Sequence, residues 1–324
     1  MNASNLSQPD AYRPGRHRVA LAATSFTWPL LFVGGLVTTY RVGMAVPDWP
    51  TTFGINMFLY DMSQAAWGVF VEHGHRLYGA AVGLCVIWLT VDFLVFGKNR
   101  THKILAVIAL IAVIAQGLLG GVRVLRNSTL LASVHGATGQ LFFGYMVVLC
   151  LLTSRAATRA PIVIDDPRRL QSSALRTVVL AYGQILLGAW LRHFPNPAAL
   201  AIHSAFSLGV VVHVLLTARA VGRLGESGAP LRIPSAVMIA TLTVQVILGA
   251  ASWLLLRPFD GIPRDVTSLQ ALIRTGHQAN AALLLGSTAW VAGLALLRYR
   301  TSEEPRGVIA ASHSASRIAE EVLA

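Results

Sequence analysis

Apolar residues fall along the chain in blocks of about twenty, separated by short polar or basic stretches. A helix of that length crosses a hydrocarbon core of roughly 30 Å, and a helix satisfies its own backbone hydrogen bonds in lipid. The pattern therefore predicts an all-α polytopic membrane protein with eight transmembrane helices. Their approximate cores are Val19–Thr39, Phe70–Phe96, Ile104–Val122, Leu130–Thr153, Leu175–Leu191, Ala199–Ala218, Ser235–Leu256 and Ala271–Leu297.

Composition and charge support this prediction and set its orientation. Of the 324 residues, 54% are hydrophobic and 12% are charged, whereas a soluble domain carries about 25% charged residues. Of the 26 Lys and Arg residues, most lie in the segments that are inner if the N-terminus is inside, which predicts a multi-pass protein of the cell (inner) membrane with both termini cytoplasmic. The net charge of +12 is thereby explained without a nucleic-acid partner. The first apolar run is too long for a signal peptide.

The odd-numbered spans share a step of small residues near their outer ends, and each following even span opens with a histidine. Gly34-Gly35 forms this step in the first span, and the later steps follow Gln116, Gln184 and Gln245. Small residues let helices approach closely in lipid, or leave room for a flat ligand. The repeat predicts two four-helix bundles related by a pseudo-two-fold axis along the membrane normal. The predicted parts are residues 1–18 (cytoplasmic N-terminus), 19–153 (first bundle), 154–174 (cytoplasmic linker), 175–297 (second bundle) and 298–324 (cytoplasmic tail).

Four of the ten histidines lie at one predicted depth, four to six residues into the even spans: His75, His135, His203 and His277. At a rise of 1.5 Å per residue this is roughly 6–9 Å below the outer ends. Histidine inside a membrane helix is costly and indicates a functional site. Two histidines facing across a bundle can hold a haem iron, and the repeat pairs the first two and the last two. The alternatives are histidines bonded within the core, or a zinc or copper site, which no cluster of Cys or carboxylate residues accompanies.

Glu72 makes the two halves chemically unequal, because it lies three residues before His75 on the same helix face, whereas Arg274 precedes His277 at that spacing. The first half is therefore predicted to be a reaction site and the second a structural or electron-transfer site. Alternatively, Glu72 is an interfacial carboxylate paired with Arg76. Arginine suits planar carboxylates, so four arginines near the outer helix ends are candidate contacts for haem propionates: Arg76, Arg123, Arg126 and Arg192. Of the remaining histidines, His73 faces elsewhere and His213 is a core residue.

These residues resemble the haem A synthase family over about residues 27–290. The resemblance rests on the stretch Gly34–Pro50 with its Pro-Asp-Trp-Pro sequence, on Glu72-His-Gly-His-Arg76, on the segment Gln116–Val124 with His135, and on the later histidines. Many members of that family carry a cysteine pair in the first outer loop. The aligned positions are Val46 and Thr52, and the two cysteines of this chain, Cys85 and Cys150, lie within apolar spans.

The resemblance implies a heme A synthase, which oxidises the C8 methyl group of haem O to a formyl group with water as the oxygen source. It implies that Glu72 is the catalytic carboxylate, that His75 and His135 flank the substrate haem, and that His203 and His277 ligate a haem b cofactor. Haem O synthase and terminal oxidase assembly factors are the implied partners, besides membrane lipid.

Three other functions fit parts of the pattern. A di-haem electron-transfer protein explains the histidines but leaves Glu72 unused. A haem carrier or assembly factor would bind haem without converting it. A transporter would require broken helices and polar residues near the middle of the membrane, and few such residues are present.

Overall fold

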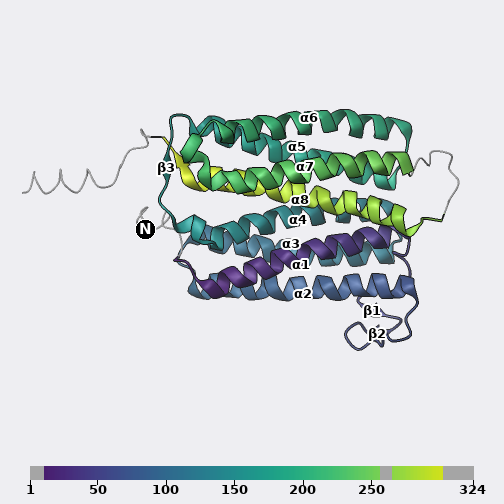
Figure 1. Ribbon diagram of the computed structural model, residues 1–324. Coiled ribbons are helices and arrows are strands. Elements are labelled where there is room, and N and C mark those ends of the chain that lie inside the picture. Colours follow the sequence, from purple (N-terminus) through teal and green to yellow (C-terminus); the bar gives the residue numbers. More distant parts are fainter. Residues whose placement is uncertain (1–10, 256–264, 302–324) are drawn as a thin grey trace, which may run out of the picture.

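The computed structural model describes residues 11–255 and 265–301 of the chain. Eight long helices run side by side through this part of the molecule (Figure 1). Each is long and apolar enough to cross a membrane, which confirms the predicted all-α polytopic fold. Their bounds are α1 (Pro14–Thr39), α2 (Trp67–Phe96), α3 (Arg100–Leu125), α4 (Thr129–Thr153), α5 (Pro167–His193), α6 (Pro197–Gly222), α7 (Ala229–Leu255) and α8 (Ser268–Arg298).

Most helices extend beyond the apolar cores that the sequence predicted, because polar flanking residues continue and cap them. The largest extension is in α5, which begins at Pro167 inside the predicted linker. There the Asp166 side chain accepts a hydrogen bond from the Arg169 backbone N–H, and Pro167 occupies the first helical turn, where proline is well tolerated. Hydrophobicity detects only the part of a helix that lies at hydrocarbon depth. Leu256, the first ten residues and most of the predicted tail lie outside the described residues.

The helices form two rings of four. In the first ring, α1 packs against α2, α2 against α3, α3 against α4, and α4 against α1. The second ring repeats this order with α5, α6, α7 and α8. The two four-helix groups lie one beside the other, with α8 and α4 adjacent between them (Figure 1). The pseudo-two-fold relation between the halves remains a prediction.

Helix α8 joins the two halves, since it contacts α5 and α7 in its own ring and α1 and α4 in the other. Its sequence reflects that position, because small residues alternate with leucines and valines and most of its residues are buried. By contrast, the outward faces of the other helices expose large apolar side chains such as Leu84, Val179 and Leu208. A water-soluble protein rarely exposes so much contiguous apolar surface, so lipid is the natural environment of these faces.

Short non-helical elements lie at the two ends of the bundle. The loop from residue 40 to 66 carries β1 (Thr51–Thr52) and β2 (Ile55–Asn56), which pair antiparallel. We call this the outer end, following the predicted orientation. At the other end, β3 (Ile162–Val163) pairs in parallel with β4 (Tyr299–Arg300), and two short 3-10 helices, η2 (Arg155–Thr158) and η3 (Gly225–Gly228), connect the long helices. A buried ion pair joins Arg16 of α1 to Asp92 of α2 there.

Candidate functional site

The four histidines of the even helices form two pairs. The rings of His75 and His135, on α2 and α4, have centroids 6.4 Å apart and planes at 86°. The rings of His203 and His277, on α6 and α8, have the same centroid separation of 6.4 Å and planes at 77°. The structure thus brings together the residues that the repeat paired, at one spacing in both halves.

A glycine of the preceding odd helix lies against each ring, because a side chain there would collide with the imidazole. A Cβ atom built on Gly34 would lie 2.9 Å from Cε1 of His75. The same construction gives 3.0 Å between Gly120 and His135, between Gly188 and His203, and between Gly249 and His277. The small residues of the repeat therefore make room for the histidine rings, in addition to any helix–helix contact.

The ring nitrogens indicate what these pairs can hold. In each of the four rings Nδ1 is buried and has no hydrogen-bond partner among the described residues, so each ring has a nitrogen free to bind a ligand. Two imidazoles that share one iron need ring centres roughly 6 Å apart, since each metal–nitrogen bond is about 2 Å long. Nowhere in the described ranges do three His, Cys, Asp or Glu side chains gather at a metal-binding distance. Each pair therefore fits a haem held between two histidines.

Two glutamines of the repeat contact the second pair, a feature that the sequence analysis did not assign. Nε2 of Gln184 lies 3.3 Å from Nε2 of His203 and donates to the His203 carbonyl at 3.0 Å. Nε2 of Gln245 lies 3.4 Å from Nε2 of His277. Both glutamines lie four residues before the glycine that faces the same histidine. This Gln-x-x-x-Gly spacing was the signal that could have identified them.

Glu72 lies completely buried under the outer loop, with 1% of its side chain exposed. Its Oε2 accepts a hydrogen bond of 2.9 Å from the Val46 backbone N–H. Its Oε1 pairs with the guanidinium groups of Arg76 at 3.3 Å and of Arg123 at 3.9 Å. The pairing of Glu72 with Arg76, one of the two interpretations of the sequence, is thus present. The carboxylate also contacts Arg123 of α3 and the Val46 N–H of the loop. The spacing of residues along α2 could not reveal either of these two contacts.

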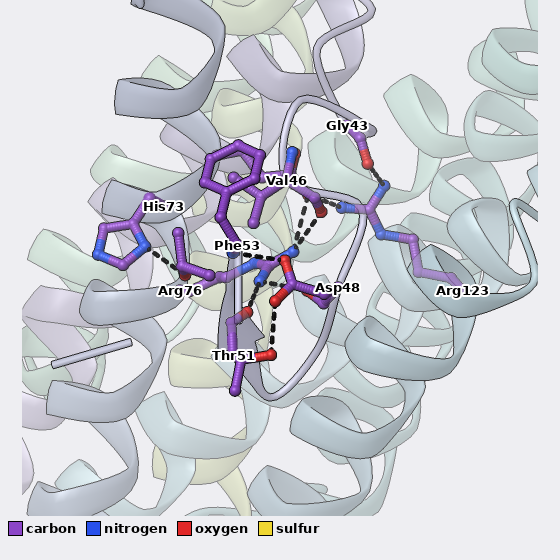
Figure 2. A network of polar contacts seen from close by, with 10 residues as sticks. Gly43, Val46, Asp48, Thr51, Phe53, His73, Arg76 and Arg123 are labelled. Atoms are coloured by element: carbon purple, nitrogen blue, oxygen red, sulfur yellow. Dashed lines mark hydrogen bonds and ion pairs between the residues drawn. The ribbon is translucent and has the colours of Figure 1, made fainter. Parts of the chain in front are cut away.

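Arg76 holds the outer loop against α2. One terminal nitrogen donates to the carbonyl oxygens of Asp48 and Thr51, at 2.7 and 3.0 Å, and the other donates to the carbonyl of Val46 at 2.8 Å. Figure 2 shows these bonds converging on one guanidinium group, with Arg123 bonded to the Gly43 carbonyl at the other side of the loop. With Glu72 as the fourth acceptor, the terminal hydrogens of Arg76 are fully used within the protein.

Asp48 orders the turn within this loop. Its carboxylate accepts hydrogen bonds from the Thr51 hydroxyl and from the backbone N–H groups of Phe53 and Gly54. Burial alone would raise the pKa of Asp48, but these hydrogen bonds, that from Gly54 foremost, lower it to about 2. Gly54 and Phe53 both have positive φ, at 77° and 52°, so the carboxylate stabilises a tight left-handed turn.

Val46 and Thr52 of the outer loop are bonded separately to α2. Val46 and Thr52 are both fully buried. Val46 bonds to Glu72, and the Thr52 hydroxyl lies 2.9 Å from Nδ1 of the next residue, His73. His73, which the sequence analysis placed on another face, therefore supports the loop. The Trp49 ring lies against Gly121 of α3, the neighbour of the glycine that faces His135. The loop therefore closes the outer end of the first ring.

The remaining candidate arginines differ in their surroundings. Arg123 bonds to the Gly43 carbonyl and pairs with Glu72. Arg192 donates to the Gly35 carbonyl at 2.8 Å and to the Thr39 hydroxyl at 2.7 Å, so it links α5 to α1. Arg126 is exposed, and no side-chain hydrogen bond or ion pair joins it to another described residue. His213 bonds to the Gly209 carbonyl of its own helix, as expected for a core histidine.

Comparison with known proteins identifies the family. The model of the family described as cytochrome oxidase assembly protein matches residues 17–205, which is more than half of the chain. The chain belongs to this family. That membership confirms the resemblance inferred from the Pro-Asp-Trp-Pro loop and the Glu-x-x-His-Arg motif, both of which lie within the matched residues.

Curated relatives give a consistent result over part of the chain. The chain is 31% identical over 140 residues to a protein named Heme A synthase from Listeria monocytogenes, which covers 42% of this chain and 43% of the relative. It is 25% identical over 167 residues to the Heme A synthase of Halalkalibacterium halodurans, covering 51% of this chain and 55% of the relative. The matches thus span about half the length of these relatives.

Proposed function

We propose that this protein is a heme A synthase, which oxidises the C8 methyl group of haem O to a formyl group. The observation that carries the proposal is the His75–His135 pair, spaced for one iron, in the half that also contains a buried carboxylate. Relatives that match 42% and 51% of the chain bear the same name. Haem O is the proposed substrate in the first half, and His203 and His277 are the proposed ligands of a resident haem b in the second.

The proposed reaction converts a methyl group and one water molecule into a formyl group, four protons and four electrons. The electrons leave to an external electron acceptor, and the resident haem would supply one-electron redox chemistry when bound. The chain's own contribution is to position the substrate haem and to exclude water from it. His75 and His135 hold the substrate from its two faces, and the loop with Trp49 limits the access of water at the outer end.

Glu72 is the proposed catalytic carboxylate. It either attacks the oxidised methyl carbon or stabilises the positive charge that develops there. Arg76, Arg123 and the Val46 N–H hold its two oxygens in fixed positions, so little reorganisation would be needed during the reaction. Arg123 and Arg192 are the better placed of the four candidate propionate contacts, because Arg76 is occupied by the loop and Arg126 is exposed.

The decisive experiment is co-expression with a source of haem O, followed by extraction and separation of the pigments. The wild-type protein should yield haem A, and Glu72→Gln should bind haem but convert at least about 100-fold less of it. Glu226→Gln is the matched control, because Glu226 is an exposed carboxylate at the other end of the molecule. Undiminished conversion by Glu72→Gln would remove Glu72 from the mechanism.

Two observations favour a second candidate, a di-haem electron-transfer protein. The pairing of Glu72 with two arginines and a backbone N–H is what a purely structural carboxylate would show, and the identical spacing of the two histidine pairs is what two equivalent haem sites would show. Such a protein would yield haem b alone in the co-expression experiment. A haem carrier or assembly factor would return haem O unchanged. Recovered haem A separates the proposed synthase from both.

A further inference from the structure

Two arginines lie at the outer end of the second ring, close to the proposed haem b ligands. Arg192 follows Gly188 by four residues on α5, and Gly188 contacts the His203 ring. Arg274 precedes His277 by three residues on α8. Both therefore lie about one helical turn, or about 5 Å, outward from the histidine pair.

The positive charges of these two arginines are not balanced by carboxylates of the part of the chain that the structure describes. Within residues 11–255 and 265–301, neither guanidinium group has a carboxylate partner, and Arg274 makes no hydrogen bond. The Nε atom of Arg192 is buried and has no acceptor in the same part of the chain. The charge of Arg274 acts on Arg192, and that of Arg41 acts on Arg274. Partly buried like charges repel, and an unpaired buried charge is strongly unfavourable, so the arrangement calls for an anion.

The first ring shows how such a charge is balanced when the protein supplies the anion. Glu72 occupies the position three residues before His75 and pairs with Arg123, which follows Gly120 by three residues on α3. In the second ring the position before the histidine holds Arg274 instead of a carboxylate. Among the described residues, the second half therefore presents a second cation where the first half has a carboxylate, and this arrangement favours an anionic ligand there.

We propose that Arg192 and Arg274 bind the carboxylates of the haem that His203 and His277 hold. This inference rests on the proposed haem b site and adds Arg274 to it. Arginine presents paired N–H donors to a planar carboxylate, and both residues lie on the outer side of the histidines. The haem is thereby oriented with its propionates toward the outer end, and the two positive charges favour its reduced form. A phospholipid phosphate is a second source of anionic oxygens, and the test distinguishes the two.

The test uses the purified full-length protein with its haem, and the variants Arg192→Gln and Arg274→Gln. Arg274→Gln is the cleaner variant, since it removes a charge without removing a hydrogen bond to any described residue. Arg176→Gln is the control, because Arg176 is an exposed arginine on the same helix as Arg192, near its opposite end. We expect the affinity for haem b to fall at least about tenfold in each of the two variants, with a lower midpoint potential of the bound haem, whereas Arg176→Gln should match the wild type.

Reconstitution with haem b dimethyl ester, whose propionates carry no charge, tests whether the arginines act on the propionate charges. The wild type should bind the ester with the lower affinity of the variants, and the two substitutions should have no further effect. The proposal would be overturned if the two substitutions lowered the affinity for haem and for the ester equally. If anionic phospholipid restored the lost affinity, the arginines would be assigned to lipid phosphate instead. Unchanged affinity and potential in both variants would also overturn the proposal. A wild-type protein without haem at His203 and His277 would instead refute the proposed function.

Discussion

The backbone N–H of Val46 donates to Oε2 of Glu72 at 2.9 Å, so the outer loop and the buried carboxylate of α2 form a single unit. Arg76 closes this unit from the other side, because it binds the Val46 carbonyl as well as Glu72. A change in the loop therefore acts directly on the proposed catalytic carboxylate.

Arg76→Gln should loosen the outer loop and lower the proposed activity together. The substitution removes donors from three loop carbonyls and the partner of a buried carboxylate, which should cost about 3–5 kcal/mol. Arg76→Lys keeps the charge but cannot reach all the acceptors, so its loop stability and haem A yield should lie between those of the wild type and of Arg76→Gln. Limited proteolysis within residues 40–66 and haem A yield measure the two effects. A proteolysis pattern like that of the wild type in Arg76→Gln would contradict the assigned role.

Reducing agents should leave the outer loop unchanged. Val46 and Thr52 are bonded to α2 residues, and Cys85 and Cys150 are free cysteines within membrane helices. Treatment with dithiothreitol should therefore alter neither the proteolysis of the loop nor haem A yield. Loss of activity on reduction of this protein would show that a thiol takes part after all.

Gly188→Ala should reduce haem binding in the second half while slightly favouring the helix itself. A Cβ atom at Gly188 would lie 3.0 Å from the His203 ring, so the imidazole must shift. Gly209→Ala in α6 is the matched control, because no other atom lies within 4 Å of the added Cβ among the described residues. Haem content and the absorbance spectrum of the purified variants check this. Equal haem content in both variants would mean that the ring has room to move.

Replacement of one histidine should affect one haem site and spare the other. His277→Ala removes a proposed ligand of haem b, and His135→Ala removes a proposed ligand of the substrate haem. The two histidine pairs lie in separate rings of helices. Reduced-minus-oxidised spectra and pigment extraction should show selective loss in each case. His213→Ala, which removes only a bond to the Gly209 carbonyl, is the control. Loss of both haems in His277→Ala would indicate a shared site.

Acid should open the loop turn around Asp48. The folded-state pKa of Asp48 is about 2, below its ordinary value of 3.8, so the ionised form is favoured by folding. Its contribution to stability is therefore complete above pH 3.8 and is lost as the pH falls toward 2. Pepsin cleavage of the loop in nanodiscs should increase over that interval. In Asp48→Asn the cleavage rate should lack this additional pH dependence, and an identical pH profile in variant and wild type would contradict the prediction.

The sequence alone predicted the eight helices, the four histidines and their pairing. These features are one-dimensional, because a span is a run of apolar residues and the Gly–His repeat is a matter of spacing along the chain. The length of α5 was less predictable, because its first turn begins at Asp166 and Pro167 outside the apolar core. The environment of Glu72 was predictable only in part: Arg76 is four residues away on the same helix, and the other two partners are not.

Only the tertiary structure decided which groups balance which charges. Glu72 meets Arg123 of α3 and the Val46 N–H of the loop because folding brings three separate segments together. Arg192 reaches across to Gly35 of the other ring, and Arg274 meets no carboxylate among the described residues. Charge balance in a buried site depends on distances across helices, which spacing along one helix does not fix. The sequence therefore determined where the histidines lie and which half carries a carboxylate, and the fold determined which arginines and backbone groups surround that carboxylate.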